Sequence, residues 1–367
     1  MNTKKMRYVW FLVILCIFCL TLFLARTRSK VEMRNRIYHQ WNEHFVVSKG
    51  KESYVRTTND SNQTVVLSEA QSYGMLITVA AAEKGQAQQA DFDRLYQYYL
   101  NHRLEGTQLM SWKQTISNGK AKDEDHNATD GDLYIAYALL KAAQQWPKQA
   151  KDYQAQAKAI LEDILAHNYN EETGVLTVGN WANQDSEFYH LMRTSDTLPA
   201  QFQIFYEVTK DSKWLDIKEK MLQQLETISS QTKTGLLPDF IWVDEQGTRV
   251  AEPKTIESKY DGAYSYNACR LPYNLVQSKD ATSQKLVKKM LNFFKSQRNL
   301  YAGYDLKGKA LNNHQAASFL APIVYASEHE KGYLKLVQQN KYIFTQDLPL
   351  NNYYDATMTT MIALELF

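Results

Sequence analysis

The sequence is poor in cysteine, proline and glycine, and each shortage excludes a class of architecture. It holds three cysteines, seven prolines and 14 glycines among 367 residues. Cys16 and Cys19 fall in one apolar run, so Cys269 is the single cysteine of the remaining chain and an internal disulfide is excluded there. We interpret Cys269 as a small buried side chain. The scarcity of proline and glycine disfavours a turn-rich β architecture and favours helices.

Excess basic charge is missing from most of the chain. Residues 1–36 carry eight basic side chains and one acidic side chain, a net charge of +7, whereas the other residues carry 34 basic and 39 acidic side chains, a net of −5. A nucleic-acid-binding protein would place its basic charge on the folded domain. We therefore expect no nucleic-acid partner.

An uncharged run of 18 residues, YVWFLVILCIFCLTLFLA, separates Arg7 from Arg26. It is long enough for a transmembrane helix and long for the core of a signal peptide, and only the partial cleavage motif FLA ends it. We predict an uncleaved signal anchor that crosses the cell membrane once, with the rest of the chain extracellular; a cleaved, secreted form is the alternative. The basic residues after the run oppose this orientation under the positive-inside rule.

The rest of the chain is divided by its helical periodicity. We predict a cytoplasmic tip and anchor at residues 1–26, a polar linker at 27–37 and one domain at 38–367, which we expect to be a monomer. The stretch DFDRLYQYYLNH repeats large apolar residues at i, i+3, i+4 and i+7. About eleven or twelve such helices, joined by short loops, predict an all-α toroid of paired helices, the (α/α)6 barrel. GVLTVG and FIWVDEQGTRVA are each expected to form a short hairpin.

Familiar cofactor and metal signatures are also missing. There is no G-x-G-x-x-G, no Walker A loop and no H-E-x-x-H. The acidic stretch DEDHNATDGD (123–132) fails the EF-hand pattern, because Ala128 stands where glycine is required. We expect no cofactor and no metal, so carboxylates must supply the chemistry. With 24 tyrosines and seven tryptophans available to stack on sugar rings, a polysaccharide is the natural substrate.

One carboxylate stands out in the small and apolar segment VVLSEAQSYGML. Ser68 is a plausible helix N-cap, and Glu69 on the first turn would meet the positive end of the helix dipole. A second interpretation is that burial keeps Glu69 protonated, which would make it a general acid. Tyr73 is expected to line the mouth of this helix.

The order of several motifs resembles glycoside hydrolase family 8 from about Gln40 to Phe367. These motifs are LSEAQSYGM, LMSWK, NATDGDLYIAYALL, RTSDTLPAQF, GLLPDF and YSYNACRLPYNL. The resemblance implies an (α/α)6 barrel and an inverting, endo-acting hydrolase of β-1,4-linked or mixed-linkage polysaccharides, without a cofactor.

The resemblance also implies roles for individual residues. Glu69 matches the general acid of the family. Asp130 in NATDGDL matches the carboxylate that holds and distorts the sugar at the cleavage point, a role compatible with capping the following helix. Trp112 in LMSWK matches a sugar-stacking position, although a core tryptophan is the competing interpretation. Arg270 in NACRLP matches an active-site arginine. The expected substrate-binding residues are Trp112, Tyr73, Arg270, Asn267 and Asp196.

The general base departs from the commonest family pattern. Asn267 stands where many members have the aspartate base, and an amide cannot accept a proton from water. A branch of the family that includes chitosanases and lichenases has Asn there and uses a glutamate from the preceding loop, which Glu257 matches best. Glu252, Asp244 and Asp261 compete for the role.

Substrate identity stays open among glucan, chitosan and xylan. We predict a β-1,4 or mixed-linkage glucan, with chitosan as the alternative that the negative domain charge permits. A membrane-anchored polysaccharide-binding protein that has lost its base is the rival from another class. A barrel enzyme of different chemistry would want histidines in its cleft, and only His126 and His190 lie near the motifs. Asp196 in RTSD is expected to bind substrate or to support the base.

Overall fold

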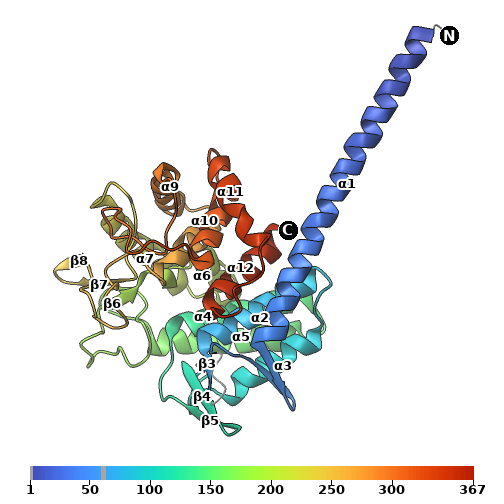
Figure 1. The fold of residues 1–367 in the computed structure, drawn as a ribbon. Coiled ribbons are helices and arrows are strands. Elements are labelled where there is room, and N and C mark those ends of the chain that lie inside the picture. The colour runs from blue at the N-terminus through green and yellow to red at the C-terminus, as the bar shows by residue number, and fades with distance from the viewer. Residues whose placement is uncertain (1–2, 59–62) are drawn as a thin grey trace.

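The computed structural model describes residues 3–58 and 63–367, and this part of the chain is mostly helical (Figure 1). It contains twelve α-helices: α1 (Thr3–Phe45), α2 (Ser68–Glu83), α3 (Gln89–Asn101), α4 (Thr129–Gln145), α5 (Ala150–His167), α6 (Pro199–Thr209), α7 (Lys213–Ser230), α8 (Leu271–Val276), α9 (Ala281–Ser296), α10 (Ala317–His329), α11 (Leu334–Asn340) and α12 (Tyr353–Leu366). The prediction of a helical domain is confirmed, and the arrangement fits an (α/α)6 barrel.

The helices form two layers, and their sequences account for the difference between the layers. Helices α12, α2 and α4 pack in succession, as do α8, α10 and α12, and each of these contacts an odd-numbered partner on its outer side. In α10 and α12 nearly every residue is buried, whereas α3 and α9 bury one stripe. A helix that is apolar all round belongs inside, and an amphipathic helix covers it.

Three small antiparallel sheets lie in the connections. They are β1 (Val46–Lys49) with β2 (Glu52–Val55), β3 (Thr64–Leu67) with β4 (Lys113–Ser117) and β5 (Lys120–Asp123), and β6 (Leu191–Arg193) with β7 (Phe240–Asp244) and β8 (Gly247–Val250). The hairpin predicted in FIWVDEQGTRVA is confirmed as β7 and β8.

The hairpin predicted in GVLTVG is reduced to one isolated antiparallel bridge, between Tyr169 and Leu176, without regular strands. Two backbone hydrogen bonds flank this bridge, from the Thr177 amide to the Asn168 carbonyl and from the Asn170 amide to the Val175 carbonyl. The Val178 carbonyl accepts a further bond from the Thr129 amide. These bonds fix the loop against the start of α4.

Helix α1 continues through residues 27–37, which corrects the expectation of a linker there. The segment contains no glycine or proline, and Arg28 pairs with Glu32 one turn later at 2.7 Å, so nothing breaks the helix. Ile37, Trp41 and Phe45 then recur on one face and are almost fully buried in the domain. The C-terminal third of α1 is therefore part of the folded domain.

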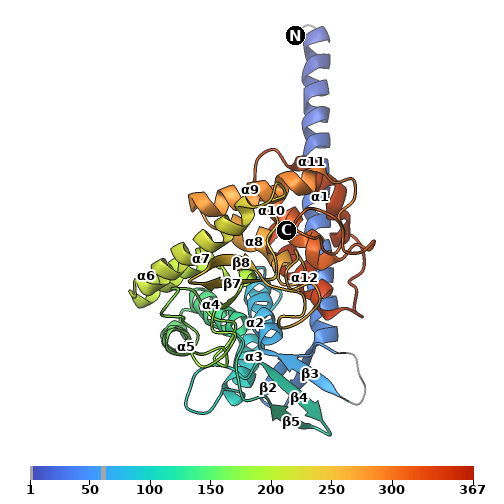
Figure 2. The same ribbon diagram turned by 90° about the vertical axis from the view of Figure 1, so that its left-hand side faces the viewer.

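The N-terminal part of α1 stands away from the domain, as Figure 2 shows. Its apolar 18-residue window has a mean hydropathy of 2.7 and none of it is buried. By length and composition, this part of the helix could cross a membrane.

Candidate active site

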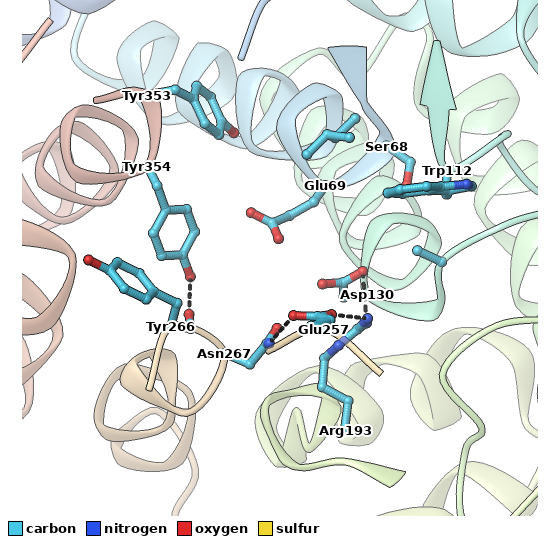
Figure 3. A pocket seen from close by; sticks show the side chains of 12 residues that line it. Ser68, Glu69, Trp112, Asp130, Arg193, Glu257, Tyr266, Asn267, Tyr353 and Tyr354 are labelled. Atoms are coloured by element: carbon cyan, nitrogen blue, oxygen red, sulfur yellow. Dashed lines mark hydrogen bonds and ion pairs between the residues drawn. The ribbon is translucent and has the colours of Figure 1, made fainter. Parts of the chain in front are cut away.

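The predicted acid, base and sugar-holding carboxylate meet in one pocket at the end of the barrel where the inner helices begin (Figure 3). The pocket measures about 360 Å³ and is lined by Leu67, Ser68, Glu69, Trp112, Ala128, Asp130, Arg193, Glu257, Tyr266, Asn267, Tyr353 and Tyr354. Several of these residues are the first or second of their helices, so the polar ends of α2, α4 and α12 converge on it.

The starts of α2 and α4 lie unusually close together. A Cβ added to Gly131 would lie 2.2 Å from Ser68 Oγ, so only glycine permits this approach. The prediction that Ser68 caps α2 is wrong, because the cap position belongs to Leu67 and Ser68 Oγ has no hydrogen-bond partner among the described residues. Asp130 likewise lies inside α4, behind Ala128 at the cap position, and accepts a hydrogen bond from the Gly131 amide. The close approach brings Glu69 and Asp130 to the same wall.

Arg270 joins these two carboxylates from beneath the pocket. Its Nη1 atom lies 3.3 Å from Glu69 Oε2 and 3.2 Å from Asp130 Oδ2, and it donates to the Tyr73 hydroxyl at 2.9 Å. Its Nη2 atom donates to Ser195 Oγ at 2.7 Å. Arg270 is 1% exposed and Tyr73 is fully buried, so both support the pocket from behind, which corrects the expectation that they contact substrate.

Arg193 also lines the pocket and was not predicted from the sequence. Its guanidinium lies 3.3 Å from Asp130 Oδ1, 3.6 Å from Asp196 Oδ2 and 3.3 Å from Glu257 Oε1. The only available signal was its position directly before the TSD of the RTSD motif. Asp196 is 1% exposed and does not line the pocket, so the structure supports a role behind Arg193 rather than direct substrate binding.

Asn267 holds Glu257 in place. Its Nδ2 atom donates to Glu257 Oε2 at 2.8 Å, and its Oδ1 atom accepts from Arg270 Nη2 at 3.1 Å. Arg193 contacts the other oxygen of Glu257. Figure 3 shows Glu69 and Glu257 entering the pocket from opposite sides, with Asp130 between the two elements that carry them.

The electrostatics separate the carboxylates into two kinds. Burial raises the pKa of Glu69 to about 7, against the opposing effect of Arg270, and Asp130 and Glu257 add to the rise. Burial also acts to raise the pKa of Asp130, but Arg193 and Arg270 outweigh it, so the pKa of Asp130 is lowered and this group is ionised. Burial raises the pKa of Asp196 to about 7 despite Arg193. Glu69 can therefore carry a proton near neutral pH beside an ionised Asp130.

Asp261, one of the rival bases, instead positions the loop of Glu257. Its carboxylate accepts hydrogen bonds from the backbone amides of Ile256, Glu257 and Ser258 at 2.7 to 3.0 Å, and it is fully buried. Asp239 does the same for the loop of Asn267, where its Oδ1 accepts hydrogen bonds from three backbone amides. Two buried carboxylates thus fix the two loops that meet at Glu257.

The other rival bases lie outside the pocket. Asp244 pairs with Arg249, and Glu252 accepts a hydrogen bond from Trp242 Nε1 at 3.0 Å. Glu257 is the only one of the four candidates among the residues that line the pocket.

Aromatic side chains form the apolar faces of the pocket. Trp112 stacks on His126 with ring centroids 5.8 Å apart, and Tyr266 is 42% exposed. The Tyr354 hydroxyl donates to the Tyr266 carbonyl, and this bond connects α12 to the loop of Asn267. Tyr266, Tyr353 and Tyr354 had not been predicted, because tyrosines are frequent throughout the sequence and nothing in their spacing marks these three.

Among the described residues no group of three or more His, Cys, Asp or Glu side chains is arranged to hold an ion. The carboxylates that do converge are separated by the guanidinium groups of Arg193 and Arg270, which already provide the compensating positive charge.

The model of the glycosyl hydrolases family 8 matches residues 13–365. The chain belongs to this family. Its family 8 relatives include a beta-glucanase from Niallia circulans, 31% identical over 298 residues that make up 78% of this chain and 72% of the relative. An endoglucanase from Bacillus sp. strain KSM-330 is 30% identical, and endoglucanase A from Acetivibrio thermocellus is 28% identical. Those two matches cover 71% and 83% of this chain but only 58% and 62% of the relatives.

Solved structures agree with this family 8 assignment. A beta-1,3-1,4-glucanase from Paenibacillus sp. X4 superimposes with a TM-score of 0.82 at 25% identity, covering 93% of this chain and 92% of that one. Rex8A from Paenibacillus barcinonensis, complexed with xylose, has a TM-score of 0.72 at 22% identity, with 91% and 93% covered, and shows the shared fold. The protein is a glycoside hydrolase.

Proposed function

We propose that the protein is an inverting, endo-acting hydrolase of β-1,4 or mixed-linkage glucan, with Glu69 as general acid and Glu257 as general base. The observation that carries this proposal is the pairing of a carboxyl whose pKa is about 7 with a second carboxylate held by Arg193 and Asn267 across the same pocket. Two carboxyl groups in different electrostatic surroundings are what acid and base assignments require.

The reaction needs one water molecule between sugar and base. Glu69 donates its proton to the oxygen of the leaving sugar while Glu257 removes a proton from the water that attacks the opposite face of the ring. Inversion requires the two carboxyl groups to lie about 6.5–9.5 Å apart, so that this water fits between the sugar and the base. Asp130, ionised and anchored by both arginines, is placed to hold the sugar at the cleavage point.

The substrate is proposed from three supports. The relatives are named beta-glucanase and endoglucanase, and the fold neighbour at 25% identity is a beta-1,3-1,4-glucanase. Trp112, Tyr266 and Tyr354 offer faces for uncharged sugar rings. Chitosan remains the alternative, since the exposed Glu257 and the negative domain charge would tolerate a cationic polymer.

The rival role, a binding protein without catalysis, rests on Asn267. The geometry argues against it, because Asn267 pairs with a carboxylate that can take over as base. We further propose that the apolar part of α1 anchors the enzyme in the cell membrane with the catalytic domain extracellular.

The test uses the full chain in detergent, with reducing-end release measured on barley β-glucan, carboxymethyl cellulose and chitosan. We expect cleavage of a glucan, with the new reducing ends appearing first as the α-anomer by proton NMR. Glu69→Gln and Glu257→Gln should each lower kcat by about 10²–10⁴-fold.

Glu252→Gln is the matched control, since it changes a carboxylate of the same loop region that lies outside the pocket, and it should keep wild-type activity. Full activity in Glu257→Gln would remove Glu257 as the base. A wild-type protein that binds glucan in affinity electrophoresis but cleaves none of the three polymers would establish the binding-protein role instead.

A further inference from the structure

The direction of α1 fixes which end of the barrel faces the apolar run. Helix α1 packs antiparallel to α12: Phe45 contacts Tyr353, with ring centroids 5.7 Å apart, and Trp41 Nε1 donates to Thr357 Oγ1. Farther towards the N-terminus of α1, Arg34 donates to the Phe367 carbonyl. Since the start of α12 lines the pocket, the N-terminal part of α1 leaves the domain at the opposite end of the barrel.

The distance along α1 between the apolar run and the domain is short. The run ends before Arg26, and Lys30 already lies over the Phe367 ring, 5.4 Å from its centroid. Four residues of helix span about 6 Å. No flexible segment separates them, so the C-terminal edge of the domain begins about one turn of helix beyond the run.

The side of the domain that faces the same way carries an exposed apolar residue flanked by lysines. Helix α11 lies on the side of the domain towards the apolar part of α1 in both Figure 1 and Figure 2. Its Leu334 is 64% exposed, one of only two large apolar side chains outside α1 that are exposed among the described residues. Lys331 and Lys335 on either side are exposed and form no ion pair with the described residues, while the nearby Glu330 pairs with Lys288.

We propose that Lys331, Leu334 and Lys335, together with Lys30, form a membrane-contact edge that rests on the anionic headgroups of the bilayer holding α1. Lysines at a bilayer surface are attracted to anionic lipids, and a leucine between them can enter the headgroup boundary. The catalytic pocket, at the other end of the barrel, then opens away from the bilayer. This inference rests on the proposed anchoring by α1 and adds a second contact and a fixed orientation to it.

The experiment places single fluorophores on the full chain in nanodiscs. Cys16 and Cys19 are replaced by serine, the buried Cys269 stays unlabelled, and an environment-sensitive dye is attached at Leu334→Cys or at the exposed control Lys120→Cys on β5. Quenching by lipids that carry a spin label on the headgroup reports proximity to the bilayer. In nanodiscs containing phosphatidylglycerol we expect quenching at position 334 to exceed that at 120 by about threefold, and the Lys331→Glu, Lys335→Glu pair to remove most of this excess.

The outcomes separate this inference from the anchoring on which it rests. A dye at Leu15→Cys quenched by acyl-chain spin labels, combined with no excess quenching at 334, would leave the anchor intact and overturn the membrane-contact edge. Absence of quenching at position 15 would overturn the anchor and the edge together. Equal quenching at 334 in nanodiscs of phosphatidylcholine alone would overturn the role of anionic headgroups. Stronger quenching at 120 than at 334 would reverse the orientation and overturn the proposal.

Discussion

At the scale of single residues, burial determines the protonation of Glu69, the proposed general acid. Glu69 occupies the first turn of α2, where the helix dipole favours its charged form. Burial nevertheless dominates and raises the pKa of Glu69 to about 7, although Arg270 acts in the opposite direction. The same carboxyl is therefore available as an acid at a pH where exposed glutamates are ionised.

A pH dependence follows from this pKa. The general acid works only when protonated, and kcat/KM reports the ionisation of the free enzyme, so kcat/KM should be sustained below pH 7 and fall as the pH rises through about 7. One unit above that value, at pH 8, we expect about a tenfold loss. The measurement is kcat/KM for glucan cleavage from pH 5 to 9, with unfolding followed by circular dichroism at each pH as the control. Activity that still increases between pH 7 and 9 would contradict Glu69 as the acid.

Asn267 supports a second prediction. Asn267→Asp would replace the amide donor of Glu257 by a like charge, and two carboxylates in contact hold a proton more tightly. We expect the acidic limb of the pH profile to move upwards by about one unit, so that kcat falls by up to about tenfold on that limb and less at neutral pH. Asn267→Ala, which removes the donor without adding charge, should leave the limb in place. An acidic limb of Asn267→Asp that coincides with that of the wild type would show that Asn267 does not support the base.

The sequence predicted the chemical residues better than their supports. Glu69 and Asp130 lie within recognisable motifs, Glu257 was the best match to a glutamate in the loop before Asn267, and the structure brings all three to one pocket. Their assigned roles remain predictions. Arg193 was missed because its importance depends on three carboxylates from distant segments, and only the folded chain brings these together.

At the scale of elements, a loop rather than a helix positions Glu257, the proposed base. Glu69 and Asp130 are fixed by the starts of α2 and α4, whose close approach depends on Gly131. Glu257 instead lies in a loop whose backbone amides bond to Asp261. Asp261 was a rival base in the sequence analysis, because the sequence alone does not distinguish a loop carboxylate that accepts backbone hydrogen bonds from one that contacts water.

Asp261→Ala tests this loop as a positioning element. Losing the acceptor of three backbone amides should displace Glu257, and a displacement of about 1 Å can cost about 10²-fold in rate. We expect kcat to fall about 10–100-fold with little change in KM. Asp305→Ala is the matched control, since Asp305 accepts backbone amides of Lys307 and Lys309 in an exposed loop away from the pocket. Equal losses in the two variants would indicate a general effect on folding.

Periodicity predicted the helices well and the short strands poorly. The helix expected in DFDRLYQYYLNH is α3, because one apolar stripe repeated over three turns has few alternatives. β6 has three residues and pairs with β7, which lies nearly fifty residues later in the sequence, so no local pattern predicts it.

At the scale of the whole molecule, α1 contains the apolar run in its N-terminal part and packs against the barrel with its C-terminal part. The expected boundary at residue 38 fell inside this helix, because the charged segment 27–37 has the composition of a linker as well as that of an exposed helix. Arg34 and Ile37, which are 7% and 0% exposed, show that the domain begins earlier.

Two truncations should therefore differ. A chain of residues 38–367 loses Ile37 and the bond from Arg34 to Phe367, while a chain of residues 27–367 keeps both. Removing a buried isoleucine side chain costs about 2–5 kcal/mol, so we expect the shorter chain to unfold at a clearly lower urea concentration. Glucan cleavage by both chains at low temperature is the control for an intact pocket. Identical unfolding midpoints would place the boundary where composition alone had suggested.

With α1 anchored as proposed, the unbroken helix also determines how the enzyme searches for its polymer. A catalytic centre on a flexible tether explores a hemisphere, whereas one on a rigid helix keeps a constant height and moves only as the protein drifts laterally in the bilayer. Its targets are then the polysaccharide segments that cross this one plane. The length of α1, rather than any contact in the pocket, would select at what distance from the cell a strand is cut.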